Sequence, residues 1–257
     1  MSAMLDDGTY QKLLSELAKT DPEKEVRWAT IRDLSDQRLL ADIAKTDPDE
    51  DVRAAAVFCM TDQGLLSRYA KNDSCWKVRE SATAKLADQT LLSEIARNDG
   101  EWNVRVTATR HLHDQKMLHE LARNTENEHV RCTALDCLVD QDLLENLVAD
   151  EKHKGIRKVV AKRLSNQILL AELARNDEDE EVREAAVMNL QDQTLLAVIA
   201  KSDQDPKVRR AAVTKLVNQE LIADIARNDI DWLVRREAIW NLTFQHHPVE
   251  YPTCDLG

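Results

Sequence analysis

The chain has 257 residues and a formal net charge of −12, which argues against a general nucleic-acid binder because such proteins present a basic surface to phosphate. Only five glycines and five prolines occur, and this scarcity favours helices over sheets. No apolar run approaches the roughly 18 residues of a membrane span, and the start lacks the basic and then apolar pattern of a signal peptide. We therefore expect neither a membrane span nor a secretory leader.

The first predicted helix covers the stretch MLDDGTYQKLLSELAK near the N-terminus. From there the chain returns to the same residues every 26 positions. Glutamine recurs at this interval from Gln11 to Gln245, and arginine from Arg27 to Arg235. Each arginine follows a valine or, once, Ile156. A period of this length is typical of a solenoid, in which each repeat is one supersecondary unit.

The repeats follow one another without insertion, which predicts a single array over residues 1–245. Its nine units cover about 11–36, 37–62, 63–88, 89–114, 115–140, 141–166, 167–192, 193–218 and 219–244. The pattern breaks at Phe244, where the other units carry Asp or Asn, and Pro248 then interrupts the leucine-rich start of a further helix. We expect residues 246–257 to form an extended tail that folds over the last repeat.

One unit illustrates the predicted first helix. Asp36 is suited to the N-cap position, and Gln37 opens a helix of about nine residues. Leu39, Leu40 and Ile43 follow at the spacing of one apolar helical stripe. This stripe predicts the face of the first helix that packs into the array.

The same unit predicts a second helix of about thirteen residues. Asp47 is suited to its N-cap, Pro48 to its first position and Glu50 to the third position of a capping box. The residues expected to face inward are Val52, Ala56, Val57 and Met60. The two helices then form a hairpin that requires its neighbours to cover its apolar face.

A small side chain usually stands four residues after each repeated valine, which allows the second helices of adjacent units to approach closely. These positions are Thr30, Ala56, Ala82, Ala108, Ala134, Val160, Ala186, Ala212 and Ala238.

An acidic residue usually stands six residues before each repeated arginine. A guanidinium can bond to a carboxylate through two hydrogen bonds and to the free carbonyls of a helix end. Because a residue repeated in nine units does not mark one active site, we interpret these residues as a structural ladder. Its members are Asp21, Arg27, Asp47, Arg53, Asp73, Arg79, Asp99, Arg105, Arg131, Arg157, Asp177, Arg183, Asp203, Arg209, Asp229 and Arg235.

This two-helix unit, with Asp and then Val-Arg, resembles HEAT repeats, particularly the short HEAT-like type of phycobilisome lyases. The resemblance covers nearly the whole chain. It implies an all-α, right-handed αα-superhelix of the armadillo type, with the Asp and Arg ladder running between neighbouring repeats. It also implies that the second helix of each unit lines the concave face.

The Leu-Leu stretch followed by Asp-Pro and Val-Arg is also similar to leucine-rich-repeat-variant proteins. Those proteins have a shorter period and, in a known case, an iron–sulfur cluster bound by clustered cysteines. This chain lacks such a cysteine cluster, and its second segment is long enough for a full helix, so the HEAT-like resemblance is preferred. Its five cysteines are odd in number and form no CxxC pair, which favours a reducing cytoplasm.

The variable positions of the second helix form the candidate binding surface. At two, six and seven residues after each repeated valine, the nine units carry nine Lys or Arg and four Asp or Glu. This face is therefore relatively basic in an acidic chain, which favours a protein or peptide partner with acidic character. The candidate contact residues are Trp28, Arg32, Phe58, Arg110, Lys158, Lys162, Arg163, Arg210, Lys215, Arg236 and Trp240.

The sixth unit, ADEKHKGIRKVVAKRL, concentrates these cations. One interpretation is a basic groove for an acidic peptide or a phosphate-bearing partner. The other is sequence drift in one repeat with a solvated basic helix. Trp76, Trp102 and Trp232 share a different position, two residues before the valine, and are interpreted as half-buried rings that cover the turn between helices.

The residues reveal no catalytic constellation, since no phosphate-binding loop, nucleophile elbow or HExxH motif occurs. His129 and Cys132 are a possible ligand pair, but no four-ligand spacing accompanies them. We expect a binding scaffold without metal or cofactor, and not an enzyme. Two alternatives stay open: a HEAT-like enzyme of the bilin lyase or DNA glycosylase type, and a structural element that associates end to end.

Overall fold

A computed structural model describes residues 6–150 and 153–246 of the chain. This part of the chain contains eighteen α-helices and no strand. The first helices of the units are α1 (Asp7–Thr20), α3 (Gln37–Thr46), α5 (Gln63–Asn72), α7 (Gln89–Asn98), α9 (Gln115–Asn124), α11 (Gln141–Asp150), α13 (Gln167–Asn176), α15 (Gln193–Ser202) and α17 (Gln219–Asn228). The second helices are α2 (Lys24–Ile31), α4 (Glu50–Phe58), α6 (Trp76–Thr83), α8 (Trp102–Arg110), α10 (Glu128–Cys137), α12 (Lys154–Ala161), α14 (Glu180–Asn189), α16 (Pro206–Lys215) and α18 (Trp232–His246).

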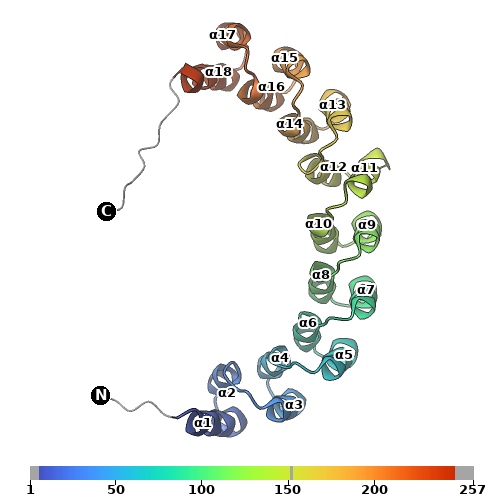
Figure 1. The fold of residues 1–257 in the computed structure, drawn as a ribbon, viewed down its shortest axis with the longest axis vertical. Helices are drawn as coiled ribbons and strands as arrows, with labels where there is room; N and C mark the ends of the chain where they lie inside the picture. The colour runs from blue at the N-terminus through green and yellow to red at the C-terminus, as the bar shows by residue number, and fades with distance from the viewer. Residues whose placement is uncertain (1–5, 151–152, 247–257) are drawn as a thin grey trace, which may run out of the picture. The chain divides into compact units, whose positions relative to one another are not determined.

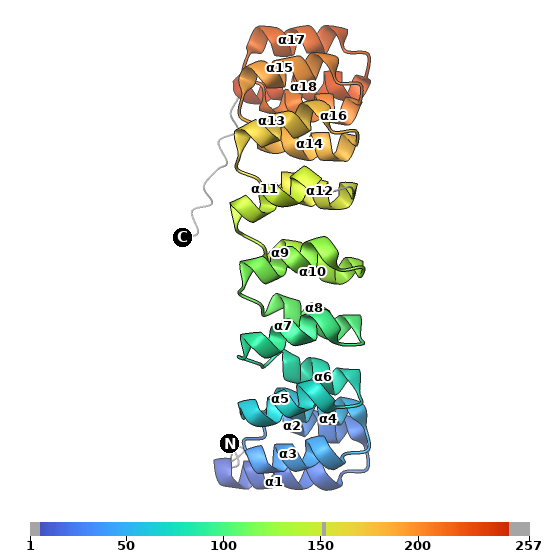
Figure 2. The ribbon, with the colours of Figure 1, turned by 90° about the vertical axis from the view of Figure 1, so that its right-hand side faces the viewer.

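The helices gather into two compact units, Met1–Leu138 and Val139–Gly257, called here the N-terminal and C-terminal units. Within each unit the odd-numbered helices form one layer and the even-numbered helices the other (Figure 1). The even-numbered layer lies on the concave side of its own unit (Figure 1). Figure 2 shows the hairpins of each unit stacked one upon the next. Within the described residues, no helix is both long and apolar enough to span a membrane.

The first helices begin as the sequence predicts. The Asp36 carboxylate accepts hydrogen bonds from the backbone N–H groups of Arg38 and Leu39, at 2.9 and 3.2 Å, and α3 starts at Gln37. Because these N–H groups have no partner inside the helix, the side-chain cap stabilises its first turn. The other first helices for which a capping bond is described carry Asp or Asn at the same position: Asp6, Asp62, Asp88, Asp114, Asn166, Asp192 and Asn218.

The predicted start of the second helix is wrong by two residues. The N-cap of α4 is Asp49, which accepts from Asp51 and Val52, and not Asp47. The Asp47 carboxylate closes the turn instead, since it accepts from the backbone N–H of Asp49 at 2.9 Å. Pro48 therefore lies in this turn and not at the first helical position. The shift also makes α4 nine residues long, shorter than the thirteen expected.

The predicted inward-facing residues of this unit are buried, namely Val52, Ala56, Val57 and Met60, although Met60 lies beyond the end of α4. At the C-terminal end, α18 extends to His246, so the first residue of the predicted tail is helical. The rest of that tail, 247–257, lies outside the described residues.

Most of the repeated glutamines fasten the turn that follows the second helix of their own unit. The Gln37 amide nitrogen donates to the carbonyl oxygen of Cys59 at 3.3 Å, and its amide oxygen accepts from the N–H of Thr61 at 3.0 Å. We call this pair of bonds the glutamine clamp. It satisfies one free carbonyl at the helix end and one N–H in the turn. The same two bonds are made by Gln11, Gln63, Gln89, Gln141, Gln167 and Gln193.

Gln219 departs from this pattern. Its side-chain oxygen is buried and has no hydrogen-bond partner within the described residues. The helix that follows, α18, has 15 residues and continues through the positions that form a turn in the other units. Its backbone N–H groups are therefore used inside the helix, and none is left for the Gln219 oxygen.

The repeated arginines join neighbouring hairpins. Arg27 donates to both carboxylate oxygens of Asp47, at 2.8 and 3.0 Å, and to the carbonyl oxygen of Asp21 at 2.9 Å. The first two bonds reach the next repeat, while the third holds the turn of its own repeat. The same bidentate pair occurs between Arg79 and Asp99, Arg157 and Asp177, Arg183 and Asp203, and Arg209 and Asp229.

The carboxylate pairing is interrupted in the first half of the chain. Arg53 donates to the carbonyl oxygens of Asp47 and Pro48, but no bond to Asp73 exists in the described structure. The Asp73 carboxylate accepts from the N–H of Cys75 instead. Arg105 keeps its bond to the Asp99 carbonyl, but the next repeat carries a threonine where the other repeats carry a carboxylate. Among the described residues the ladder therefore consists of backbone bonds in eight repeats, those of Arg27, Arg53, Arg79, Arg105, Arg131, Arg183, Arg209 and Arg235, and of carboxylate bonds in only some.

Candidate functional site

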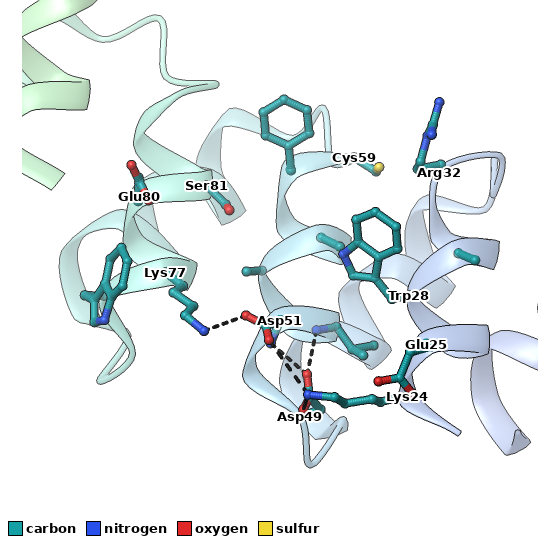
Figure 3. A pocket seen from close by; sticks show the side chains of 16 residues that line it. Lys24, Glu25, Trp28, Arg32, Asp49, Asp51, Cys59, Lys77, Glu80 and Ser81 are labelled. Carbon is teal, nitrogen blue, oxygen red and sulfur yellow. Dashed lines mark hydrogen bonds and ion pairs between the residues drawn. The ribbon is translucent and has the colours of Figure 1, made fainter. Parts of the chain in front are cut away.

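A hollow of about 1020 Å³ lies on the even-numbered face of the N-terminal unit, between α2, α4 and α6. Three aromatic residues line it, Trp28 on α2, Phe58 on α4 and Trp76 on α6. Figure 3 shows Trp28 projecting into this space. We call this hollow, with its aromatic lining, the aromatic groove.

The hollow arises because large side chains flank small ones. Trp28 and Phe58 are 46% and 52% exposed. Between them, α4 presents Ala54 and Ala55 as part of the lining. An alanine fills little of the space that the neighbouring rings leave open, so the face is concave at this point. The floor of the groove is therefore apolar and its walls are aromatic.

One edge of the groove is a network of ion pairs at the N-terminal ends of the second helices. Lys24 lies 3.1 Å from an Asp49 oxygen, and Lys77 lies 2.6 Å from an Asp51 oxygen (Figure 3). Lys77 also lies 2.8 Å from a Glu50 oxygen. Hydrogen bonds from these lysines to Asp49 and to Asp51 raise the pKa of Lys24 and of Lys77, respectively. Exposed pairs of this kind contribute little to stability. The two ammonium groups face three carboxylates, so both cations at this edge have partners.

The opposite edge carries cations at the C-terminal ends of the second helices. Arg32 is the C-cap of α2, and the Lys85 ammonium lies 5.3 Å from the centre of the Phe58 ring. Burial raises the pKa of the Cys59 thiol, and the charges of Lys85 and Arg32 oppose that rise, so both cations lie near this thiol. Neither Arg32 nor Lys85 forms an ion pair with a carboxylate in the part of the chain that the structure describes.

Three of the predicted contact residues therefore meet at one place: Trp28, Arg32 and Phe58 all line the groove. Arg110 does not line this hollow, although it is exposed at the end of α8. The other predicted contact residues belong to the C-terminal unit.

The basic cluster predicted in the sixth unit is partly neutralised within the chain. The Lys158 ammonium lies 2.9 Å from Glu181, and Lys154 lies 2.9 Å from Asp179. Lys162 is exposed and Arg163 is half-buried. Residues 151–152, which belong to the same cluster, lie outside the described residues. With Arg157, which pairs with Asp177, three cations of this cluster thus already have carboxylate partners on the next repeat.

The remaining candidates of the C-terminal unit are spread over α16 and α18. Lys215 donates to the carbonyl oxygen of Met188, and burial lowers the pKa of Lys215. The Arg236 guanidinium lies 5.3 Å from the centre of the Trp232 ring. Arg210 is half-buried, and Trp240 is 69% exposed.

Sequence reasoning missed one residue that lines the groove, Trp76, and one beside it, Lys85, which contacts the Phe58 ring but does not line the hollow. Trp76 was expected to cover the turn between helices, but it lines the groove from α6. Lys85 was not selected, although it stands at one of the variable positions that were examined for charge. Both could have been selected from their place in the sequence, because they lie in the repeat that directly follows the repeat of Phe58. Trp102 does lie against a neighbour, since its ring stacks on His129 with centroids 4.4 Å apart.

That stacking also bears on the possible His129 and Cys132 ligand pair. The described residues contain no group of three or more His, Cys, Asp or Glu side chains placed to hold a metal ion. The contact with Trp102 uses the face of the His129 ring and leaves its two nitrogens, which lie in the ring plane, unobstructed by the stacking.

Solved structures share this architecture. A leucine-rich repeat variant with a novel repetitive structural motif matches 80% of this chain and 82% of its own, with 26% sequence identity and a TM-score of 0.64. The Escherichia coli protein YibA matches 87% of this chain and 98% of its own, with 16% identity and a TM-score of 0.46. No protein-family model matches the sequence, and no curated protein matches it.

The sequence resembles two kinds of repeat protein, and a solved structure of one of them, a leucine-rich repeat variant, is similar to this chain. The paired helices, repeated in register through both units, are those of a HEAT-like array. The chain is an all-helical repeat protein built from HEAT-like two-helix units.

Proposed function

We propose that the chain is a non-enzymatic scaffold that binds a protein or peptide partner on the face made by the second helices. The observation that carries this proposal is the aromatic groove, where Trp28 and Phe58 stand about half exposed beside an apolar floor. Large exposed aromatic residues around a concave, small-residue surface are typical of the residues that dominate binding energy at protein interfaces.

The dimensions of the groove support an elongated ligand. Pockets for small molecules usually have volumes of about 300–1000 Å³ and enclose most of the ligand. The aromatic groove is at the upper end of that range, about 1020 Å³, and three successive second helices line it. A peptide that crosses these helices contacts one variable position after another, which is how a repeat array distinguishes its partners.

Affinity capture from a nuclease-treated lysate of the source cell tests the proposal. The wild-type chain is compared with a Trp28→Ala, Phe58→Ala double variant. A Trp240→Ala variant is the matched control, because it removes an exposed tryptophan from the C-terminal unit. All three are first shown to have the same circular dichroism spectrum.

We expect a protein to be retained by the wild-type chain and the Trp240→Ala control, and to be lost from the double variant. Loss from the Trp240→Ala variant alone would move the site to the C-terminal unit. If the wild-type chain retains no protein, the scaffold proposal is wrong. Binding of duplex DNA or of bilin, seen as a mobility or absorbance shift, would favour the enzyme alternative instead.

A further inference from the structure

The two edges of the aromatic groove differ in charge balance. At the N-terminal ends of the helices, Lys24 and Lys77 already lie within about 3 Å of carboxylates. At the C-terminal ends, Arg32 and Lys85 have no carboxylate partner among the described residues. A ligand carboxylate therefore finds at this edge two cations that no carboxylate engages in an ion pair, while Glu25 and Glu80 also line the groove.

One carboxylate lies near the cationic edge. Asp33 follows Arg32 in sequence and its charge acts on the Cys59 thiol, but it forms no ion pair with Arg32 or Lys85 among the described residues. Its carboxylate accepts a hydrogen bond from the Tyr10 hydroxyl of α1 at 3.1 Å, which holds one oxygen toward α1 and raises the pKa of Tyr10.

The helix ends explain why the cations stand at this edge without being neutralised. The C-terminal end of a helix carries a partial negative charge on its free carbonyls, which favours a nearby cation. Arg32 caps α2, and Lys85 lies just beyond the end of α6. Such a partial charge stabilises a nearby cation. It is smaller than a full unit of charge, so the cation can still attract a ligand carboxylate.

We propose that the groove takes a peptide segment that carries a large apolar side chain beside a carboxylate. The apolar side chain lies between Trp28 and Phe58, over Ala54 and Ala55, and the carboxylate meets Arg32 and Lys85. Burying the apolar group supplies most of the affinity, while the ion pairs fix the direction of the segment. This inference rests on the proposed scaffold function and specifies the chemistry of its partner.

Fluorescence anisotropy with three labelled synthetic peptides tests this chemistry. Each peptide has about twelve residues, enough to cross three helices spaced about 10 Å apart. The first alternates Leu or Phe with Asp or Glu. The second has Lys and Arg in place of the acids, and the third has Ser in place of the apolar residues.

Matched charge reversals locate the site. Arg32→Glu and Lys85→Glu change the cationic edge. Arg110→Glu is the control, because Arg110 occupies the position equivalent to Arg32 three repeats further on and does not line the groove. Circular dichroism and thermal unfolding establish that the variants keep the fold.

We expect the acidic and apolar peptide to bind at least about tenfold more tightly than either of the others. Arg32→Glu and Lys85→Glu should each weaken it several-fold, and together they should reverse the preference in favour of the basic peptide. The Arg110→Glu control should bind like the wild-type chain.

Other results would overturn the inference. Equal binding of the acidic and basic peptides, or equal loss in the Arg110→Glu control, would show that Arg32 and Lys85 do not select the ligand. Self-association that is lost on Trp28→Ala, detected by sedimentation, would assign the groove to a second copy of the chain. If the lysate partner depends on Trp28 and Phe58 but the acidic peptide does not bind, the partner chemistry is wrong and the scaffold proposal stands.

Discussion

Arg183 and Asp203 form a buried, bidentate ion pair between two successive hairpins, with nitrogen to oxygen distances of 2.9 and 3.0 Å. The arginine is only 4% exposed and also donates to the carbonyl oxygen of Asp177 at 2.9 Å. One side chain thus holds the turn of its own repeat and the turn of the next.

Replacing Arg183 by alanine should lower the free energy of unfolding by about 3 kcal/mol, because the change leaves the Asp203 carboxylate buried without its partner. Urea unfolding followed by circular dichroism measures the loss. Arg53→Ala is the matched control, since Arg53 makes backbone bonds but no bond to Asp73. Its cost should be nearer 1 kcal/mol. Equal losses would show that the carboxylate pairs contribute nothing beyond the backbone bonds.

The glutamine clamp offers a second comparison. Gln193→Leu removes the bonds to the carbonyl of Lys215 and the N–H of Val217, and should cost about 1 kcal/mol. Hydrogen exchange in the turn after α16 should become faster. Gln219→Leu should be neutral or slightly stabilising, because the Gln219 oxygen is buried without a partner among the described residues. A larger loss for Gln219→Leu than for Gln193→Leu would contradict this account of the clamp.

Close approach of the second helices depends on small residues such as Ala186, which is completely buried on α14. Ala186→Leu should therefore overpack the contact with the neighbouring hairpins and lower the free energy of unfolding by about 1–3 kcal/mol. Met188→Leu, on the exposed side of the same helix, is the control and should change it by less than about 0.5 kcal/mol. Thermal unfolding of the two variants decides the point, since equal midpoints would refute the packing argument.

Acid should weaken the array through the carboxylates of the ladder. Burial by itself would raise the pKa of Asp99, but hydrogen bonds from Arg79 and from the N–H of Glu101 outweigh it and hold that pKa below its ordinary value. The pKa of Asp229 is lowered in the same way by Arg209 and the N–H of Asp231. A lowered folded pKa gives stability that is complete above the unfolded value of about 4, and that is lost as the pH falls through the folded value.

The free energy of unfolding, measured by urea titration from about pH 6 down to about pH 2, should therefore fall below about pH 4. An Asp99→Asn variant should show a shallower fall, and an Asp99→Asn, Asp229→Asn double variant a shallower one still. Curves that stay parallel to the wild-type curve would show that these carboxylates do not account for the loss.

The fold could be predicted from the sequence because the repeat supplies the same evidence many times. Caps such as Asp36 and apolar positions such as Val52 and Ala56 follow local rules, which tertiary contacts reinforce here. The start of the second helix could not be predicted by the same local rules. Asp47 is a residue type that often caps helices, but its carboxylate binds Arg27 of the preceding repeat and the N–H of Asp49 instead. Because Arg27 lies in another unit, inspection of one unit alone does not reveal this interaction.

The candidate site was less accessible to sequence reasoning. Trp28, Arg32 and Phe58 stand at variable positions and could be selected for that reason. The hollow between them depends on Ala54 and Ala55 and on the separation of three helices, which many side chains determine jointly. The cations of the sixth unit formed a stronger pattern in the sequence, but Lys158 is paired with Glu181 of the next repeat.

The bonds between hairpins have a mechanical consequence. In the C-terminal unit, the arginine pairs join residues 20 positions apart, and Asn189 and Asn241 reach back 28 positions. Each bond therefore ties one hairpin to its neighbour. A pulling force applied to the ends of this unit meets the interfaces between hairpins in series, so each interface carries the whole load, shared among its bonds and packed side chains, while the extensions add. Under tension such a stack lengthens as a soft spring, and it yields one hairpin at a time.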